Sequence, residues 1–251
     1  MTTKETPTRA RDVVIWSADV DDATLKRALT DADQNLQFVK LDLVRLIKMG
    51  FPIIRTVQEE WGYKVFADAK IYEVPVKVLE LAELSLEHKP WMLNVMADIW
   101  STDEMTHQDP KKVEVLKRYA DACLAVGTKP CAVTVLTSKA KDVVKKQFNG
   151  RNAVEQVLVY AEVLLRAGFT DMVCSPQEVN AIRQYSRFDD IQLNTPAIRL
   201  PDTSNDDQAR VATPAGAIEN GSDRLVIGRN LTSGNLAENF ARVAANLGME
   251  E

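Results

Sequence analysis

Short apolar segments alternate with helical segments along the whole chain, and this alternation restricts the possible folds more than any other feature. Eight segments have the β-branched and aromatic content of buried strands, and they begin near Val13, Phe38, Lys64, Trp91, Cys131, Asp171, Ile191 and Leu225. Helical patterns lie between them, and Pro75, Pro110 and Pro176 each stand where a helix begins, a position that tolerates the missing N–H. Strands that alternate with helices predict βαβ units and a parallel sheet.

The number of these units predicts a closed barrel. About eight units in 251 residues is the count of an α/β protein with a single (β/α)8 TIM barrel. An open doubly wound sheet is the alternative, but no glycine fingerprint follows the first strand. We therefore predict one barrel domain over residues 12–251, preceded by a flexible segment over residues 1–11. The longest irregular stretch, Ile198–Ala212, lies before the last strand, and loops of that length are usually functional.

Composition argues against several classes of protein. The net charge of −5, with no basic stripe, is not typical of a nucleic-acid surface. No apolar stretch approaches the roughly 18 residues that cross a bilayer, and the polar first residues do not have the pattern of a signal sequence. Cys123, Cys131 and Cys174 are far apart in the sequence and form no CxxC motif, which is typical of free thiols in a reducing compartment. His88 and His107 have no Cys or His neighbours at the spacing of metal ligands. We expect a cytoplasmic protein with no metal and with no nucleic-acid or membrane partner.

Charged and polar residues follow the predicted strands. In barrels of this kind the chemistry takes place at the C-terminal ends of the strands. Those ends carry, in chain order, Asp19, Lys40, Asp68, Lys70, Asn94, Asp98, Ser138, Ser175, Arg199, Gly228 and Arg229. The first three strands thus supply two aspartates and two lysines.

Asp68 and Lys70 have two possible interpretations. They are two positions apart on a strand, so they share a face. If that face meets water, they form a solvated pair that contributes ~0–1 kcal/mol. If it lies in the barrel mouth beside Asp19 and Lys40, the cluster would be expensive as a purely structural feature. Alternating charges of this kind can keep a lysine protonated for use as an acid.

A phosphate site is indicated near the end of the chain. Gly228 and Arg229 follow the eighth strand, where barrels commonly bind phosphate, and the long loop brings Asp207–Arg210 nearby. Each signal is weak alone, because a Gly-Arg pair after a strand is common and the loop segment has the composition of a polar turn. Together they favour a small phosphorylated ligand.

The charge-rich segment Lys139–Lys146 is interpreted as a solvated face, with part of a mobile lid as the alternative.

These residues resemble the motifs of the orotidine 5′-monophosphate decarboxylase family. The resemblance covers most of the chain and has two parts. The first is a DxKxxD strand with neighbouring VK, LTS and VCS-x-QE elements, at Phe66–Lys70, Val39-Lys40, Val135–Ser138 and Val173–Glu178. The second is a C-terminal series that resembles the family's signature in order, at Thr195–Arg199, Asp206–Pro214 and Ile227–Arg229. Sister families of sugar-phosphate decarboxylases and aldolases lack this second series.

The resemblance implies an activity and a role for each site residue. A member of this family removes CO2 from position 6 of the pyrimidine of orotidine 5′-monophosphate, without cofactor or metal, and yields uridine 5′-monophosphate. The implied catalytic residues are Lys40, Asp68, Lys70 and Glu73, with Lys70 as the proton donor to C6. The family is a homodimer in which the fourth acid comes from the neighbouring subunit. The implied substrate contacts are Asp19 and Lys40 with the ribose, Ser138 with the pyrimidine amide edge, Gln208 and Arg229 with the phosphate, and Arg199 and Gly228 elsewhere on the substrate.

Some positions depart from the family pattern. Glu73 stands where the family has aspartate, and Lys77 where it usually has threonine. Asp42 and Ala197 replace glycines, and Met96 replaces a histidine. Because Glu73 and Lys77 fall in the segment that subunits share, a second hypothesis stays open: a catalytically weak or divergent relative that binds a nucleotide or a sugar phosphate.

Overall fold

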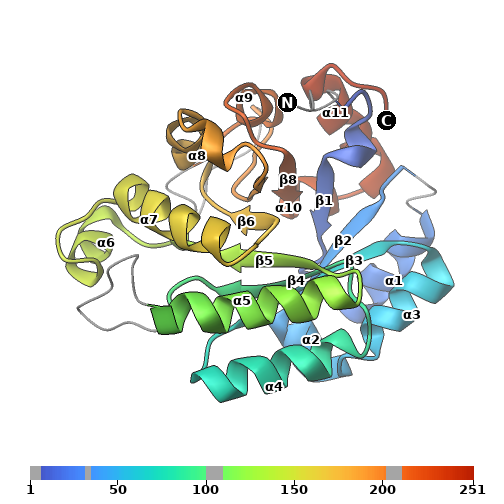
Figure 1. Ribbon diagram of the computed structural model, residues 1–251. Helices are drawn as coiled ribbons and strands as arrows, with labels where there is room; N and C mark the ends of the chain where they lie inside the picture. The colour runs from blue at the N-terminus through green and yellow to red at the C-terminus, as the bar shows by residue number, and fades with distance from the viewer. Residues whose placement is uncertain (1–6, 32–34, 100–109, 202–210) are drawn as a thin grey trace.

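Eight parallel strands close into a barrel, in sequence order, in the computed structural model (Figure 1). The structure describes residues 7–31, 35–99, 110–201 and 211–251. The predicted (β/α)8 barrel is confirmed. The strands are β1 (Val14–Ser17), β2 (Phe38–Asp42), β3 (Lys64–Ile71), β4 (Met92–Met96), β5 (Lys129–Val133), β6 (Asp171–Val173), β7 (Gln192–Thr195) and β8 (Arg224–Ile227).

Helices surround the barrel and connect the strands (Figure 1). They are α1 (Asp22–Asp31), α2 (Leu43–Met49), α3 (Ile53–Trp61), α4 (Pro75–Leu86), α5 (Pro110–Ala125), α6 (Lys141–Gln147), α7 (Ala153–Arg166), α8 (Pro176–Arg183), α9 (Pro214–Glu219), α10 (Arg229–Thr232) and α11 (Leu236–Leu247), with short 3-10 turns at Ala10–Asp12 and Ser186–Phe188. The sequence pattern does not indicate α6, α9 and α10. They have seven, six and four residues, too few for a clear helical period.

Alternation along the strands divides the core into two parts. Ile15 of β1 packs inside the barrel, whereas its neighbours Val14 and Trp16 pack against the surrounding helices. The inner cluster also takes one buried side chain from each of five other strands, namely Phe38, Phe66, Met92, Cys131 and Val226. Because successive side chains of a strand point to opposite faces, this period of two fills both the barrel and its outer layer. The inner cluster closes the barrel beneath the strand ends.

The start of the chain packs against its end. The Ala10 amide donates to the Glu250 carbonyl at 2.7 Å, and the Glu250 amide donates to the Thr8 carbonyl at 3.2 Å. Ala10 is fully buried. The predicted flexible segment over residues 1–11 includes residues 1–6, which lie outside the described chain. Its described part, from residue 7 onward, is attached to the barrel at these points.

A buried ion cluster lies at the N-terminal end of the barrel. The Asp171 side chain is fully buried at the first position of β6, where its Oδ1 accepts from Arg224 Nη1 at 2.8 Å and from Asn194 Nδ2 at 3.1 Å. Lys129 Nζ lies 3.8 Å from Asp171 Oδ2. The Arg224 guanidinium also stacks 5.2 Å from the centre of the Trp91 ring. Each of these groups has fixed protein partners, as a structural cluster requires.

We expect Asp171→Ala to lower the free energy of unfolding by roughly 3–5 kcal/mol, because the change removes a fully buried carboxylate and leaves the largely enclosed Arg224 guanidinium without its partner. Urea denaturation measures the loss. Lys117→Ala, which removes an exposed surface partner of Asp121, is the control and should leave the free energy of unfolding nearly unchanged. A similar small change for both variants would contradict a structural role for Asp171.

Candidate active site

A cavity of about 510 Å³ opens at the C-terminal ends of the strands. Seven of the residues predicted from the sequence line it: Asp19, Lys40, Asp68, Lys70, Arg199, Gly228 and Arg229. They come from β2, from β3 and from the segments that follow β1, β7 and β8, so closure of the barrel brings together residues far apart in the chain. Their roles in binding and catalysis stay predictions.

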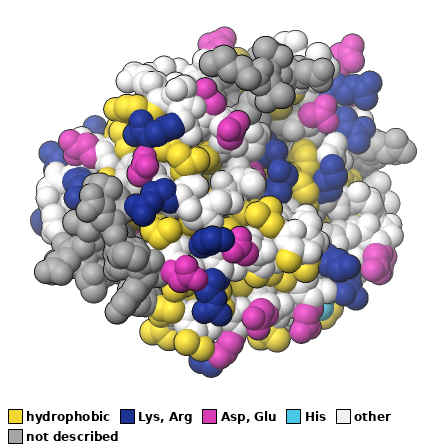
Figure 2. Space-filling view, in the orientation of Figure 1, with side chains coloured by type: hydrophobic (Ala, Val, Ile, Leu, Met, Phe, Trp, Pro, Cys, Tyr) yellow, Lys and Arg dark blue, Asp and Glu magenta, His cyan; other side chains and the backbone are white. Residues whose placement is uncertain are grey.

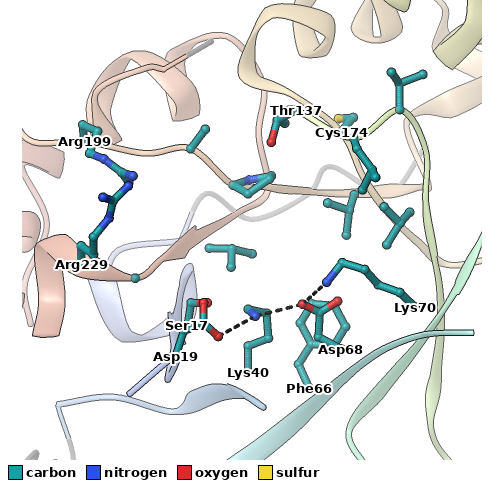
Figure 3. A pocket seen from close by; sticks show the side chains of 18 of the residues that line it. Ser17, Asp19, Lys40, Phe66, Asp68, Lys70, Thr137, Cys174, Arg199 and Arg229 are labelled. Carbon is teal, nitrogen blue, oxygen red and sulfur yellow. Dashed lines mark hydrogen bonds and ion pairs between the residues drawn. The ribbon is translucent and has the colours of Figure 1, made fainter. Parts of the chain in front are cut away.

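Asp68 is the centre of a chain of alternating charges (Figure 3). Its Oδ2 lies 2.9 Å from Lys40 Nζ and 2.6 Å from Lys70 Nζ. Lys40 Nζ also lies 3.2 Å from Asp19 Oδ1. Lys40 and Asp68 are buried, whereas the side chain of Lys70 is 39% exposed and that of Asp19 is 51% exposed. A ligand in the cavity can therefore reach Lys70 and Asp19, the two ends of this series of charges.

The charges stabilise one another despite burial. Burial alone would raise the pKa of the Asp68 carboxyl, but the charges of Lys40 and Lys70 and their hydrogen bonds outweigh it and hold this pKa well below its ordinary value. Burial alone would lower the pKa of Lys40, but Asp68 and Asp19 outweigh it and raise this pKa. Asp68 and Lys40 are thus both ionised at neutral pH, which fixes a negative charge at the cavity floor.

Lys70 has an uncommon backbone conformation. Its φ is 44°, in the left-handed region that few residues other than glycine adopt. The pairing of β3 with β4 is irregular between Ala67 and Ile71, around this residue. Strain of this kind persists where surrounding contacts enforce it, and it is concentrated at functional sites.

One buried amide holds both Lys70 and Asp68. The side chain of Asn94, on β4, accepts from the Lys70 backbone N–H at 2.7 Å and donates from Nδ2 to Asp68 Oδ1 at 2.6 Å. Asn94 is fully buried. Sequence reasoning placed Asn94 at a strand end but gave it no role. The signal was present, since an amide in the otherwise apolar β4 needs partners.

Arginines lie on another side of the cavity. Figure 3 shows the side chains of Arg199 and Arg229 facing each other, away from Asp68 and Lys70. Arg199 is held in place by its backbone, whose N–H donates to the Ala212 carbonyl at 2.9 Å. Two guanidinium groups at one end of a cavity suit a phosphate, which arginine binds through paired hydrogen bonds. Gln208, predicted to join them, lies outside the described residues.

Ser138 and Glu73 do not line the cavity. Ser138 is exposed, whereas its neighbour Thr137 does line the cavity. Glu73 is also exposed, and its Oε1 accepts from the Val74 N–H at 2.9 Å. Lys77 pairs with Glu80 on the surface.

Two polar residues that line the cavity are not indicated by the sequence, namely Ser17 and Thr137. Ser17 donates from Oγ to Asp19 Oδ2 at 2.7 Å.

The described residues offer neither a metal site nor a helix that could span a membrane. They contain no group of three or more His, Cys, Asp and Glu side chains arranged to hold a metal ion. Among the same residues, no helix has the length and apolar character needed to cross a membrane.

The sequence comparisons identify the family. A family model described as "Orotidine 5′-phosphate decarboxylase / HUMPS family" matches residues 12–242. The chain belongs to this family. An orotidine 5′-phosphate decarboxylase of Haemophilus influenzae is 34% identical over 237 residues, which cover 93% of this chain and 96% of the relative. One from Dictyoglomus turgidum is 31% identical over 210 residues, which cover 82% of this chain and 84% of the relative.

A solved structure agrees with the family assignment. The crystal structure of orotidine 5′-phosphate decarboxylase from Lactobacillus acidophilus superposes with a TM-score of 0.75 at 27% identity. The match covers 94% of this chain and 99% of that one. The barrel described above is therefore the fold of this family over almost its whole length.

Acid should remove the stability that Asp68 contributes. Its pKa is lower in the folded chain than the roughly 3.9 of an unfolded aspartate. The contribution is therefore complete above about pH 4 and is lost as the pH falls through the lowered folded pKa. The difference in free energy of unfolding between the wild type and Asp68→Asn, measured in urea, should stay constant from about pH 6 to about pH 4 and shrink from there to about pH 3.

The control for this experiment is Asp121→Asn, which removes one charge of an exposed surface pair. Its difference from the wild type should stay below about 1 kcal/mol at every pH. A difference for Asp68→Asn that stays constant or grows on acidification would contradict the ionised cluster.

Proposed function

We propose that this protein is a carboxy-lyase that converts orotidine 5′-monophosphate to uridine 5′-monophosphate and CO2 in pyrimidine biosynthesis. The observation that carries the proposal is the Lys40–Asp68–Lys70 cluster, with one lysine open to a cavity whose other side carries two arginines. The names of the relatives support it. We also propose that the protein acts in the cytoplasm.

The cluster provides what this reaction needs. When the bond between C6 and the carboxylate breaks, its electron pair stays on C6 and CO2 leaves. A proton must then reach C6, and the Lys70 ammonium supplies it and regains a proton from water. Electrons are neither gained nor lost overall, so the reaction balances without an oxidant or reductant. We propose that the reaction uses no cofactor.

Asp68 contributes by its fixed charge. A substrate carboxylate placed beside Lys70 would also lie near the Asp68 carboxylate, because the two protein groups are 2.6 Å apart. Repulsion between the carboxylates raises the energy of the bound substrate, and it disappears as CO2 forms. Interactions that favour the transition state over the bound substrate raise the rate of the chemical step.

The remaining residues would hold the nucleotide in place. Arg229 and Arg199, with Gln208, would bind the phosphate, and Asp19 with Lys40 would bind ribose hydroxyls. The predicted contact of Ser138 with the pyrimidine amide edge belongs to the loop whose Thr137 lines the cavity. Energy gained at the phosphate, far from C6, can be used to orient the ring at Lys70.

Lys70→Ala should lower kcat by a factor of about 10²–10⁴, the usual contribution of a general acid. The loss of orotidine 5′-monophosphate absorbance on mixing with the purified protein measures turnover. Lys64→Ala is the matched control, because Lys64 is a lysine at the opposite end of the same strand and donates to Gln37 on the surface. Near-normal turnover of Lys70→Ala would show that another group donates the proton.

The same assay tests the alternative function. A wild-type protein that binds uridine 5′-monophosphate but leaves orotidine 5′-monophosphate unchanged would be a weak or divergent relative. Glu73 and Lys77 would then be the first departures from the family pattern to revert.

An exposed apolar face supports a homodimer. Helices α2 and α4 both pack beside β3, and they expose Val44 (72%), Ile47 (74%) and Val76 (65%). Figure 2 shows hydrophobic side chains over the lower part of the molecule, where Figure 1 places α4. Several large apolar side chains exposed on neighbouring helices are typical of an interaction site. Because Glu73 lies at the start of this face, we propose that a second copy binds here and receives Glu73 into its cavity.

A shared site can be tested by mixing two inactive variants. If Glu73 completes the partner's site, refolding Lys70→Ala and Glu73→Ala chains together gives heterodimers in which one of the two sites is intact. Random pairing should then restore up to about a quarter of the wild-type activity. Lys70→Ala mixed with Asp68→Ala is the control, because no heterodimer then has both groups in one chain. Heterodimers that show no recovery would contradict a shared site.

A further inference from the structure

Arg45 is a buried arginine that lies outside the cavity. Its side chain is only 6% exposed. The guanidinium donates from Nη1 to Asp22 Oδ1 at 2.6 Å and from Nη2 to the Val20 carbonyl. Its Nε has no hydrogen-bond partner among the described residues. An apolar side chain of similar volume would be at least as stable at such a position, so the stability of the fold does not account for this arginine.

Both acceptors of Arg45 lie close to Asp19: Val20 belongs to the connection that carries it, and Asp22 is the first residue of the helix that follows. This β1–α1 loop has only four residues, 18–21, between Ser17 and the start of α1. On the strand side, the Ala18 N–H donates to the Lys40 carbonyl at 3.1 Å. On the helix side, Arg45 holds Val20 and Asp22. Asp19 therefore lies between two anchors, and Arg45 supplies the second.

The position of Arg45 depends on the same strand as Lys40. Asp42, the last residue of β2, accepts from the Arg45 backbone N–H at 3.0 Å and caps α2. Lys40, two residues earlier, reaches Asp19 directly. The end of β2 thus fixes the position of Asp19 in two ways. The Lys40 ammonium contacts Asp19 directly, and Arg45 holds the residues before and at the start of α1, an arrangement called here the Arg45 clamp. The cap itself depends on the Asp42 carboxylate.

We propose that Arg45 is a positioning residue for nucleotide binding, because it fixes the β1–α1 loop and holds Asp19 at the cavity. It does not line the cavity and makes no contact with the substrate. The proposal rests on the proposed function only for the choice of ligand. A hydrogen bond between a ligand and a carboxylate depends steeply on distance, so a loop that moves by ~1 Å weakens binding strongly.

The test is a double-mutant cycle on the full-length protein. Calorimetry measures the affinity for uridine 5′-monophosphate in the wild type, Arg45→Met, Asp19→Ala and the double variant. Arg45→Met should weaken binding about tenfold, and the double variant should bind as weakly as Asp19→Ala alone, because coupled residues are not additive. Wild-type affinity in Arg45→Met, or two losses that multiply, would overturn the proposal.

Lys48→Met is the matched control. Lys48 pairs with the same Asp22 carboxylate at 2.7 Å but is exposed and makes no bond to Val20, so its loss should leave the affinity unchanged. If Arg45→Met does not fold, Arg45→Lys replaces it. The shorter ammonium keeps the charge but cannot reproduce the two-pronged contact, so weaker binding is again expected.

A second measurement needs no ligand. Amide hydrogen exchange at residues 18–21 should be faster in Arg45→Met than in the wild type and unchanged in Lys48→Met. Unchanged exchange in Arg45→Met would overturn the clamp. Failure of the wild type to bind the nucleotide would instead contradict the proposed function, and the exchange experiment would still decide the role of Arg45.

Discussion

The carboxylate of Asp68 is the group on which the rest of the site depends. A buried charge is tolerated only with close partners, and here they come from two neighbouring strands. In the register of β2 and β3, Lys40 pairs with Phe66 and Asp42 with Asp68, so Lys40 and Asp68 are diagonal neighbours on one face. A slip of one residue in this register would turn one of them out of the barrel. The ion cluster and the barrel register therefore specify each other.

The neighbouring strand β4 constrains the other side of the Asp68 carboxylate. β4 lies beside β3, and its Asn94 joins the Asp68 carboxylate to the Lys70 backbone. The left-handed conformation of Lys70 needs this support, because a lysine does not favour it. Because the buried Asn94 amide holds the Lys70 backbone, the base of the flexible lysine side chain has a fixed position. Lys70 can then be partly exposed to the cavity and still lie 2.6 Å from Asp68.

The sequence predicts the barrel because strand and helix periods are local properties, and it predicts Asp19, Lys40, Asp68 and Lys70 because barrel closure brings strand ends together. Other features depend on three-dimensional detail. The conformation of Lys70 has no glycine to mark it, and the position of Thr137 rather than Ser138 at the cavity depends on loop geometry. Glu73 is exposed in a single chain, so only the family resemblance indicates a role for it. From the sequence alone, Arg45 is indistinguishable from an exposed polar residue of an amphipathic helix; only the structure shows that it is buried.

The two ends of the barrel show how a structural ion cluster differs from a reactive one. Each end has a buried aspartate, Asp171 or Asp68, with two cations. Arg224 meets fixed partners on several sides, namely Asp171 and the Trp91 ring. Lys70, within the described residues, has one ion pair for an ammonium with three donors, and it borders a cavity of about 510 Å³. A cation with donors left over beside an open cavity can give a proton to a ligand, whereas one enclosed by protein groups can only stabilise the fold.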